Sequence, residues 1–296
     1  MLPTMSTAQV GRLTIGIVGP GSLGTAMAIS LHTAGYRIPQ IFSRSPKSSR
    51  QPGRALARKV GARTALIGRD ECTADVLWLC VPDREIRNCA ELLARSGQWS
   101  RRVVLHSSGA LTSDELAALG RCGASVASAH PLMTFVPGEV PLLNAVPFAI
   151  EGDRKATRTA SHIARHLGGA PFPIRKSDKA AYHAWATFAS PLLTALLTTT
   201  EQVARRAGVS TQEAHRRMLP ILWQTLANYA SLGAANAFSG PIARGDIDTV
   251  KRHLRALEST LVAQKVYAAL ALAAIEYLPT KNKTGLKHVI ERAVRR

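Results

Sequence analysis

Residues 15–24 constrain the fold of this chain more than any other segment, because a short apolar run leads directly into three closely spaced glycines. Gly19, Gly21 and Gly24 fit the pattern G-x-G-x-x-G. In a strand–turn–helix unit, the first glycine permits a tight turn, the second lets the backbone approach a pyrophosphate, and the third allows close helix–strand packing. A helix that begins near Ser22 would point its free N–H groups at those phosphates. The segment therefore predicts a dinucleotide-binding turn.

The residues after the second predicted strand indicate which dinucleotide is bound. An NAD site offers an Asp or Glu to the adenosine ribose about twenty residues after the turn. This chain has Ser43-Arg44-Ser45 there and no Asp or Glu before Asp70. Because an arginine can pair bidentately with a phosphate, we expect NADP(H). The expected cofactor contacts are Gly19, Pro20, Gly21, Ser22, Leu23, Gly24, Ser43, Arg44, Ser45, Val81 and Pro82.

Apolar runs alternate with helical periodicity in the first part of the chain. The predicted strands are 13–18, 38–42, 75–81, 103–106 and 125–129, with 147–150 and 170–174 as candidates to extend the same sheet. Helices are predicted at 22–34 and 54–60, and after residue 177 only helical segments follow, at 178–206, 211–232 and 248–277. This order predicts an α/β fold, in which a Rossmann-like doubly wound parallel sheet is followed by a smaller all-helical domain.

The same reading divides the chain into four segments. We predict a flexible N-terminus at 1–11, a dinucleotide-binding Rossmann-like domain at 12–175, and an all-helical substrate and dimerisation domain at 176–280. The last segment, 281–296, reads as a basic tail that is either disordered or in contact with an acidic partner.

Composition excludes several classes of function. The net charge of +19 would suit a nucleic-acid-binding protein, but the basic residues are scattered, aromatic residues make up only 5%, and no nucleic-acid-binding motif is present. We interpret the charge as a basic surface that attracts anionic cofactors and substrates. Four cysteines without a Cys-x-x-Cys pair predict reduced thiols and no metal site. The absence of a signal-peptide pattern and of a membrane-spanning segment favours a cytoplasmic protein.

Two predicted strands end in histidines. His106 begins the sequence His-Ser-Ser-Gly, and His130 begins His-Pro-Leu. Ligands of such sheets bind at the carboxyl ends of the strands, so both histidines are candidates for acid–base or substrate-binding roles. The alternative for each is a structural histidine whose hydrogen bonds are satisfied within the protein.

A polar stripe follows the predicted helix 178–206. It comprises Lys179, His183, Thr187, Ser190, Thr194 and Thr198, which share one face of an otherwise apolar helix. The hydroxyl groups can bond back to helix carbonyls, but this does not account for Lys179 and His183. We predict that Lys179, and secondly His183, anchors a substrate carboxylate and delivers a proton. Arg244 is a further candidate to reach the substrate across an interdomain cleft, whereas Asp246 suits a helix cap.

Taken together, these segments resemble an uncharacterised oxidoreductase-like family that joins a Rossmann-like NADP-binding domain to a helical domain of unknown function. The resemblance covers about residues 13–277 and is carried by His106-Ser-Ser-Gly109, His130-Pro-Leu132, Pro147-Phe-Ala-Ile-Glu-Gly152, Lys179-x-x-Tyr-His183 and Gly240-Pro-Ile-Ala-Arg-Gly-Asp246. The family is similar to pyrroline-5-carboxylate reductase and deazaflavin-dependent NADP oxidoreductases. The resemblance implies a catalytic role for Lys179, with His183 where relatives have Asn. It also indicates a kink at Pro191.

We therefore expect an NADP(H)-dependent oxidoreductase that transfers hydride to or from a small, anionic substrate in the interdomain cleft. The cofactor would carry the reaction, while Lys179 or His183 supplies the proton. A homodimer is expected, since the predicted helices are too apolar for one subunit to cover. The alternatives are a prephenate- or arogenate-dehydrogenase-like enzyme, suggested by the two strand-end histidines, and a non-catalytic NADP-binding sensor or scaffold.

Overall fold

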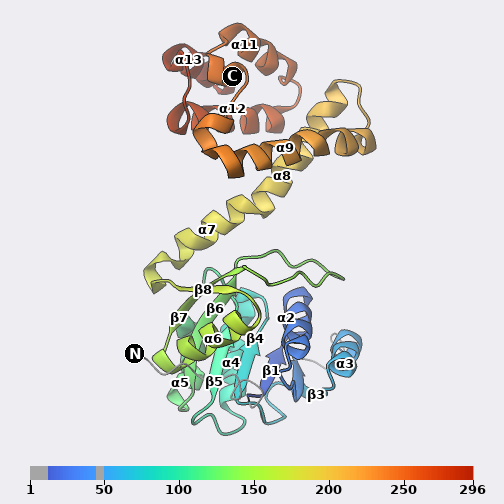
Figure 1. Cartoon of the computed structure of the whole chain (residues 1–296), viewed down its shortest axis with the longest axis vertical. Coiled ribbons are helices and arrows are strands. Elements are labelled where there is room, and N and C mark those ends of the chain that lie inside the picture. The colour runs from blue at the N-terminus through green and yellow to red at the C-terminus, as the bar shows by residue number, and fades with distance from the viewer. Residues whose placement is uncertain (1–12, 45–49, 296) are drawn as a thin grey trace. The chain divides into compact units, whose positions relative to one another are not determined.

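In a computed structural model of this protein, residues 13–44 and 50–295 are described. The chain divides into two compact units, Met1–Thr187 and Phe188–Arg296 (Figure 1). The first unit therefore extends beyond the boundary predicted at residue 175, because it includes residues of the first long helix that pack on the sheet. The predicted flexible segment 1–11 and the predicted cofactor contact Ser45 lie outside the described residues.

The first unit is built on one eight-stranded sheet with the order β3-β2-β1-β4-β5-β6-β7-β8. Its strands are β1 (Ile15–Val18), β2 (Gln40–Ser43), β3 (Arg63–Leu66), β4 (Val76–Leu79), β5 (Val103–His106), β6 (Ser125–Pro131), β7 (Pro147–Gly152) and β8 (Ala170–Pro173). All neighbours pair in parallel except β6 and β7, which are antiparallel. The predicted fold class is confirmed, and both candidate strands extend the sheet.

The antiparallel pairing of β7 departs from the all-parallel sheet that the alternation predicts. Its cause lies in the connection between β6 and β7, since residues 132–146 contain no helix. A parallel pair needs a crossover, usually through a helix, whereas a chain that returns without one pairs antiparallel. The edge strand β3 was also not predicted, because Arg63 and Thr64 are exposed polar residues and leave no apolar run.

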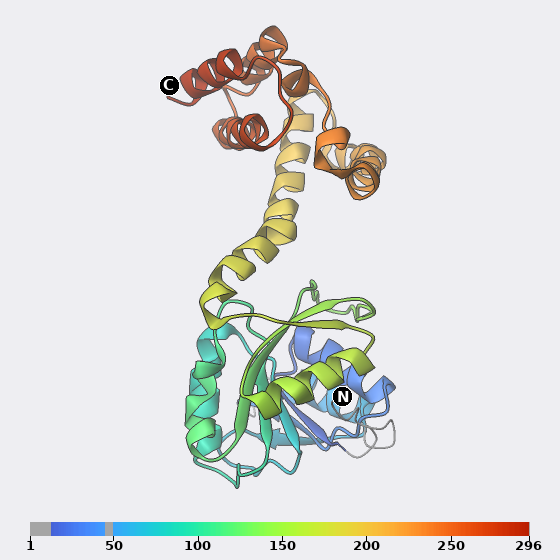
Figure 2. The same ribbon diagram turned by 60° about the vertical axis from the view of Figure 1, so that its left-hand side comes forward.

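Helices cover both faces of the sheet (Figure 2). One face packs against α2 (Ser22–Thr33), α3 (Arg50–Lys59) and α6 (Arg154–His166), and the other against α4 (Asp83–Ala94), the short turn η1 (Ser113–Leu116) and α5 (Ala117–Arg121). Each face of the sheet has its own hydrophobic core, and alternate residues of β4 pack into the two cores. Val76 and Trp78 pack into the first, and Leu77 and Leu79 into the second. This period of two is expected of strands buried on both faces.

The helical part of the chain is more interrupted than its periodicity predicts. After the short turn η2 (Lys176–Asp178), its helices are α7 (Lys179–Ala189), α8 (Pro191–Arg206), α9 (Thr211–Ala237), α10 (Pro241–Arg244), α11 (Ile247–Ala256), α12 (Leu261–Tyr277) and α13 (Lys283–Val294). The predicted helix 178–206 breaks at Ser190, whose backbone is non-helical (φ −128°, ψ −77°) before Pro191. Proline lacks the N–H that a continuous helix would need there, in agreement with the expected kink. The predicted helix 248–277 is likewise split between α11 and α12.

The basic segment 281–296 differs from the predicted tail. Most of it forms α13, in which Leu286 and Ile290 are fully buried. They pack with α11 and α12 around residues such as Val250 and Ala271. Apolar residues four positions apart place one face of this helix in the core, while its lysines and arginines remain on the outside.

Candidate functional site

The glycine turn after β1 has the backbone that its sequence predicts. Gly19 has a positive φ of 96°, and a Cβ atom there would lie 2.6 Å from the carbonyl oxygen of Cys80. A Cβ atom on Gly24 would lie 1.9 Å from the Gly19 carbonyl oxygen. Gly21 faces open space and precedes the first residue of α2, whose N-terminus has no side-chain cap and no acidic residue. Free N–H groups and the positive end of the helix dipole therefore face this space, as a pyrophosphate requires.

A cavity of about 290 Å³ opens at this turn. It is lined by Val18, Gly19, Pro20, Gly21, Ser43, Arg44, Pro52, Ile67, Cys80, Val81 and Pro82. The turn and the ends of β2 and β4 thus meet around one space, as the sequence predicts. The predicted contacts Ser22, Leu23 and Gly24 do not line the cavity. Gly24 instead serves the close packing of α2 against the turn.

Arg44 is paired with a carboxylate that the sequence did not bring to notice. Its Nη1 atom lies 2.6 Å from an oxygen of Glu85 in the first turn of α4. The guanidinium holds the pKa of Glu85 below its usual value, chiefly through this hydrogen bond. Glu85 is distant from Arg44 in sequence, and no spacing rule connects them. At the edge of the cavity, the arginine therefore has one acidic partner and remains about half exposed (47%).

A chain of hydrogen bonds leads from the cavity to the carboxyl ends of β5 and β6. Asp83 follows the cavity residue Pro82 and accepts a hydrogen bond from the Ser108 hydroxyl at 2.8 Å. The Ser108 carbonyl oxygen in turn accepts from Lys179 Nζ at 3.0 Å. These hydrogen bonds join Asp83, the sequence neighbour of a cavity residue, to the predicted catalytic lysine at the same edge of the sheet.

Lys179 is fully buried rather than open to a ligand. Besides the Ser108 carbonyl oxygen, its ammonium group donates to Ser128 Oγ at 2.6 Å. Burial lowers the pKa of Lys179 to about 8, although the charges of Glu151 and Asp83 act in the opposite direction. Two of its three N–H groups are therefore used within the protein, which is the pattern of a residue that holds the site together.

His106 is also engaged on both ring nitrogens. Its Nδ1 atom accepts from the Ser108 backbone N–H at 3.1 Å, so the proton of the neutral ring is on Nε2, which lies 2.9 Å from the Thr112 carbonyl oxygen. Burial lowers the pKa of His106 to about 4, and the ring is neutral at physiological pH. This geometry matches the structural alternative for His106 and leaves neither ring nitrogen free for a substrate.

His130 and His183 lie on either side of Gly109. Their ring centroids are 6.1 Å apart and the rings are nearly perpendicular. A Cβ atom on Gly109 would lie 2.9 Å from His130 Nε2 and 2.6 Å from His183 Cδ2, so only glycine fits between them. His130 Nδ1 is 2.8 Å from the hydroxyl of Tyr182, a residue for which the sequence suggested no role. These partly exposed histidines are the predicted acid–base groups that remain available at this edge.

The rest of the polar stripe is satisfied within its own helices. Thr187, Thr194 and Thr198 each donate to the carbonyl oxygen four residues earlier, at 2.8–3.2 Å. In the second unit, Asp246 caps α11 by accepting from the N–H and the hydroxyl of Thr249. Arg244 ends the short helix α10 in the same unit and is exposed. Its predicted contact with substrate stays a prediction.

Neither a metal centre nor a membrane-spanning helix is found in the part of the chain that the structure describes. No group of three or more His, Cys, Asp or Glu side chains in residues 13–44 and 50–295 is arranged to hold a metal ion. Over the same ranges, no helix combines the length and the apolar character needed to cross a bilayer.

Comparison with protein families agrees with the two-part organisation. Residues 1–131 match a Rossmann-like domain, and residues 146–274 match a domain of unknown function, DUF2520. The chain thus combines the two domains that the sequence resemblance predicted. No curated protein sequence matches the chain.

Solved structures share this fold over almost the whole chain. A protein of Bacteroides fragilis that is assigned as an NADP oxidoreductase is 20% identical, with a TM-score of 0.75 over 89% of this chain and 98% of that one. A protein of Thermotoga maritima is 24% identical, with a TM-score of 0.68 over 96% and 100%. The reductive aminase of Aspergillus terreus, solved with NADPH and ethyl-5-oxohexanoate, is 19% identical, with a TM-score of 0.57 over 96% and 94%.

Proposed function

We propose that this protein is an NADP(H)-dependent oxidoreductase that transfers hydride to or from a small anionic substrate. The observation that carries the proposal is that the glycine turn with its cavity and the two available histidines lie at the carboxyl edge of one sheet. The cofactors named for similar structures, NADPH among them, support the same conclusion. When bound, the nicotinamide supplies or accepts the hydride, and the protein supplies orientation and a proton.

The cavity residues fit the adenosine and pyrophosphate parts of this cofactor. The open space at Gly21 and the uncapped N-terminus of α2 suit the pyrophosphate. Arg44 and Ser43 line the place expected for the phosphorylated ribose. Glu85 holds Arg44 through a single ion pair, and a phosphate could exchange for that carboxylate because it carries more negative charge and has three acceptor oxygens.

The substrate end of the site is assigned to the groups around Gly109. We infer that His130 and His183 contact the substrate, because both rings border this glycine at the edge of the sheet. Lys179 is buried and does not contact the substrate in this proposal, but its positive charge favours an anion nearby. The prephenate-like alternative loses one of its two supporting histidines, since both ring nitrogens of His106 are occupied.

A non-catalytic NADP-binding protein is the second candidate. It is favoured by one observation, which is that two of the predicted catalytic groups, Lys179 and His106, are buried and hydrogen-bonded within the protein. The two functions differ in whether NADPH is consumed.

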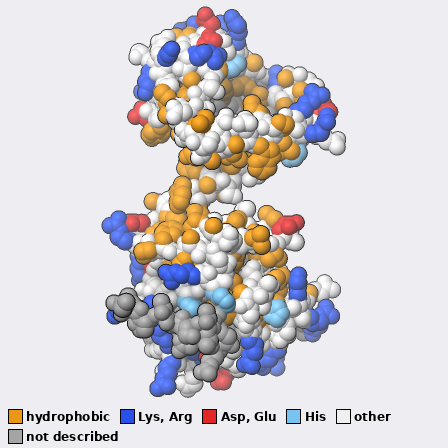
Figure 3. Space-filling view, viewed as in Figure 1, with side chains coloured by type: hydrophobic (Ala, Val, Ile, Leu, Met, Phe, Trp, Pro, Cys, Tyr) orange, Lys and Arg blue, Asp and Glu red, His pale blue; other side chains and the backbone are white. Residues whose placement is uncertain are grey.

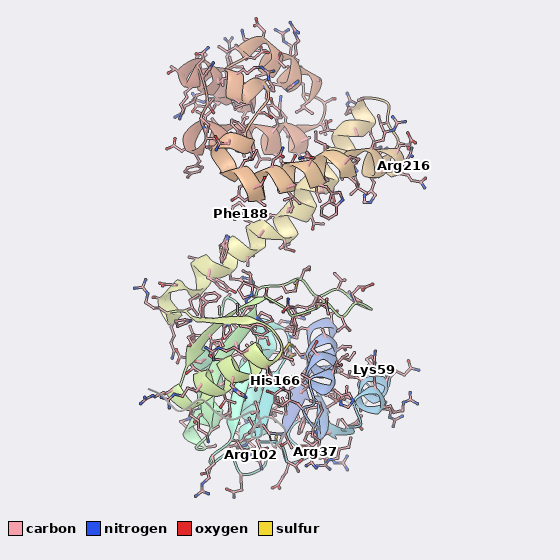
Figure 4. The ribbon with its side chains drawn as sticks, in the orientation of Figure 1. Arg37, Lys59, Arg102, His166, Phe188 and Arg216 are labelled. Atoms are coloured by element: carbon pink, nitrogen blue, oxygen red, sulfur yellow. The ribbon has the colours of Figure 1, made fainter. Side chains whose placement is uncertain are left out.

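The test is NADPH oxidation with a panel of keto acids, carbonyl compounds and cyclic imines. With a substrate that is turned over, we expect His130→Asn and His183→Asn each to lower the rate by about 100-fold, with NADPH affinity unchanged within about twofold. This is the scale of a lost hydrogen-bond donor or proton-transfer group at the reacting atoms. His166→Asn, on the exposed C-terminal turn of α6 (Figure 4), is the matched control and should keep full activity. Turnover of no panel member, with NADPH binding intact, would instead support the non-catalytic candidate.

We further propose that the protein is a homodimer. Large apolar side chains are exposed on α8 and α9 of the second unit, and Figure 3 shows apolar surface gathered on this unit. They are Leu192, Leu193, Leu219, Ile221, Trp223, Leu226, Tyr229 and Leu232. Apolar patches of this kind mark association surfaces, and a second copy of the same helices offers a surface of matching character.

A further inference from the structure

Tyr182 and His130 form a hydrogen-bonded pair that none of the assigned roles uses. The Tyr182 hydroxyl lies 2.8 Å from His130 Nδ1, and the two rings meet edge to face with centroids 5.5 Å apart. Tyr182 is 7% exposed, so its hydroxyl is held in a nearly dry environment. The ring of Phe172 packs against Tyr182 at a centroid distance of 6.1 Å, and Trp185 does so at 5.9 Å. The phenol is therefore fixed on several sides.

Which group donates this hydrogen bond follows from the protonation state and the burial of the phenol. Burial raises the pKa of Tyr182 to about 12, so the hydroxyl keeps its proton. A buried O–H that donates to nothing is costly, and His130 Nδ1 is the partner found for it among the described residues. Tyr182 therefore donates and Nδ1 accepts. A neutral imidazole that accepts at Nδ1 carries its own proton at Nε2.

The protonated nitrogen is accessible to a ligand. His130 is half-buried, and its Nε2 has no hydrogen-bond partner among the described residues, yet it is not one of the side-chain atoms that are both buried and unpaired. It lies close to Gly109, where a Cβ atom would come within 2.9 Å of it. Burial and the positive charge of Lys179 lower the pKa of His130 to about 4, so the ring is neutral at physiological pH. The group presented toward a ligand is thus a neutral N–H.

We propose that Tyr182 is a positioning residue, which holds His130 as the Nε2–H tautomer so that it offers a hydrogen-bond donor, rather than a base, to a ligand oxygen. A carbonyl or carboxylate oxygen of the substrate is the matching acceptor. The identity of the ligand rests on the proposed function, whereas the tautomer of His130 does not depend on that function.

The experiment is long-range ¹H–¹⁵N correlation NMR of the ligand-free, full-length protein at neutral pH, with ¹⁵N-labelled histidine. The His130 signals are assigned by their loss in His130→Asn. We expect His130 to show an unprotonated Nδ1 and a protonated Nε2, and we expect Tyr182→Phe to shift both nitrogens toward the average of the two tautomers. A wild-type His130 with its proton on Nδ1 would overturn the proposal, and so would a tautomer that does not respond to Tyr182→Phe.

His106 provides the internal control in the same spectra. The Ser108 N–H fixes its Nε2–H tautomer independently of Tyr182, so its signals should not move in Tyr182→Phe. If they do move, the variant has changed the fold, and the wild-type His130 tautomer alone decides the proposal. Lack of turnover in the substrate panel would count against the proposed function but leave this result unaffected.

Discussion

At the scale of single residues, the guanidinium of Arg44 is a binding group for which a carboxylate and a cofactor phosphate would compete. The Glu85 carboxylate holds its guanidinium, and a ribose phosphate would need the same N–H groups. We predict that Arg44→Ala weakens NADPH binding by about tenfold or more, the scale of a charge-assisted hydrogen bond, with little effect on NADH. Glu85→Gln should tighten NADPH binding severalfold, because it releases the arginine.

The measurement is fluorescence titration with each reduced cofactor. Arg37→Ala is the matched control, since Arg37 is an exposed arginine that precedes β2, at the opposite end of the strand from Arg44 (Figure 4). Its removal changes the net charge by the same amount but should leave both affinities unchanged. Equal affinity of the wild type for NADPH and NADH would contradict the assignment of Arg44.

At the scale of single residues, the sequence predicted the groups that local backbone chemistry determines. Gly19, Gly21 and Gly24 could be assigned because their spacing alone specifies a turn. Glu85 and Tyr182 could not, because their roles depend on partners far away in sequence. For His106 the sequence left two roles open, and the structural one holds because a loop brings the Thr112 carbonyl oxygen to its ring.

At the scale of elements, Lys179 is a buried residue of α7 that bonds the helix to the sheet. The pKa of Lys179 is lowered to about 8 in the folded protein, so between pH 8 and its ordinary value of 10.5 the unfolded chain binds more protons than the folded one. Stability therefore rises with pH in this window. We compare the free energy of unfolding of the wild type with that of Lys179→Met. Between pH 8 and 10.5, we predict that this difference shifts in favour of the wild type by up to about 3 kcal/mol, at about 1.4 kcal/mol per pKa unit.

Urea unfolding at both ends of this pH window measures the effect. The control is Lys59→Met, since Lys59 is an exposed lysine at the end of α3 (Figure 4) and its removal should give a difference that does not vary with pH. If the difference in unfolding free energy between wild type and Lys179→Met also stays constant across this pH window, burial does not lower the pKa of Lys179.

Elements were predictable where one physical effect dominated. Buried strands such as β4 and β5 are continuous apolar runs, and their positions follow from the sequence. The break at Ser190 was expected from Pro191, whereas the interruption between α11 and α12 is harder to predict, because apolar periodicity continues across it. The helix α13 was hidden by its charge, since buried Leu286 and Ile290 occupy only one face.

At the scale of the whole molecule, the feature that needs a partner is the apolar surface of α8 and α9, whose large side chains are exposed. We predict a dimer in solution, and we expect Trp223→Glu to raise its dissociation constant by at least about tenfold, as loss of a large apolar anchor does. Trp223 is 67% exposed, so the substitution costs little in the isolated fold. Light scattering coupled to size exclusion measures the state.

Leu142→Glu is the control for that experiment. Leu142 is 85% exposed but belongs to the connection before β7 in the first unit, outside α8 and α9. Its substitution should leave the dimer intact. A wild type that remains monomeric at micromolar concentration would remove the proposed dimer.

The antiparallel pairing of β6 with β7 has a consequence for where this chain could be cut. The Rossmann-like match ends at residue 131 and the second match begins at residue 146, between these two paired strands. Strands β7 and β8 thus belong to the second match by sequence but complete the sheet of the first unit. A protein cut between the two matches would carry an open sheet edge on one side and two unpaired strands on the other. The segments that the families share and the segments that pack together are therefore different stretches of this sequence.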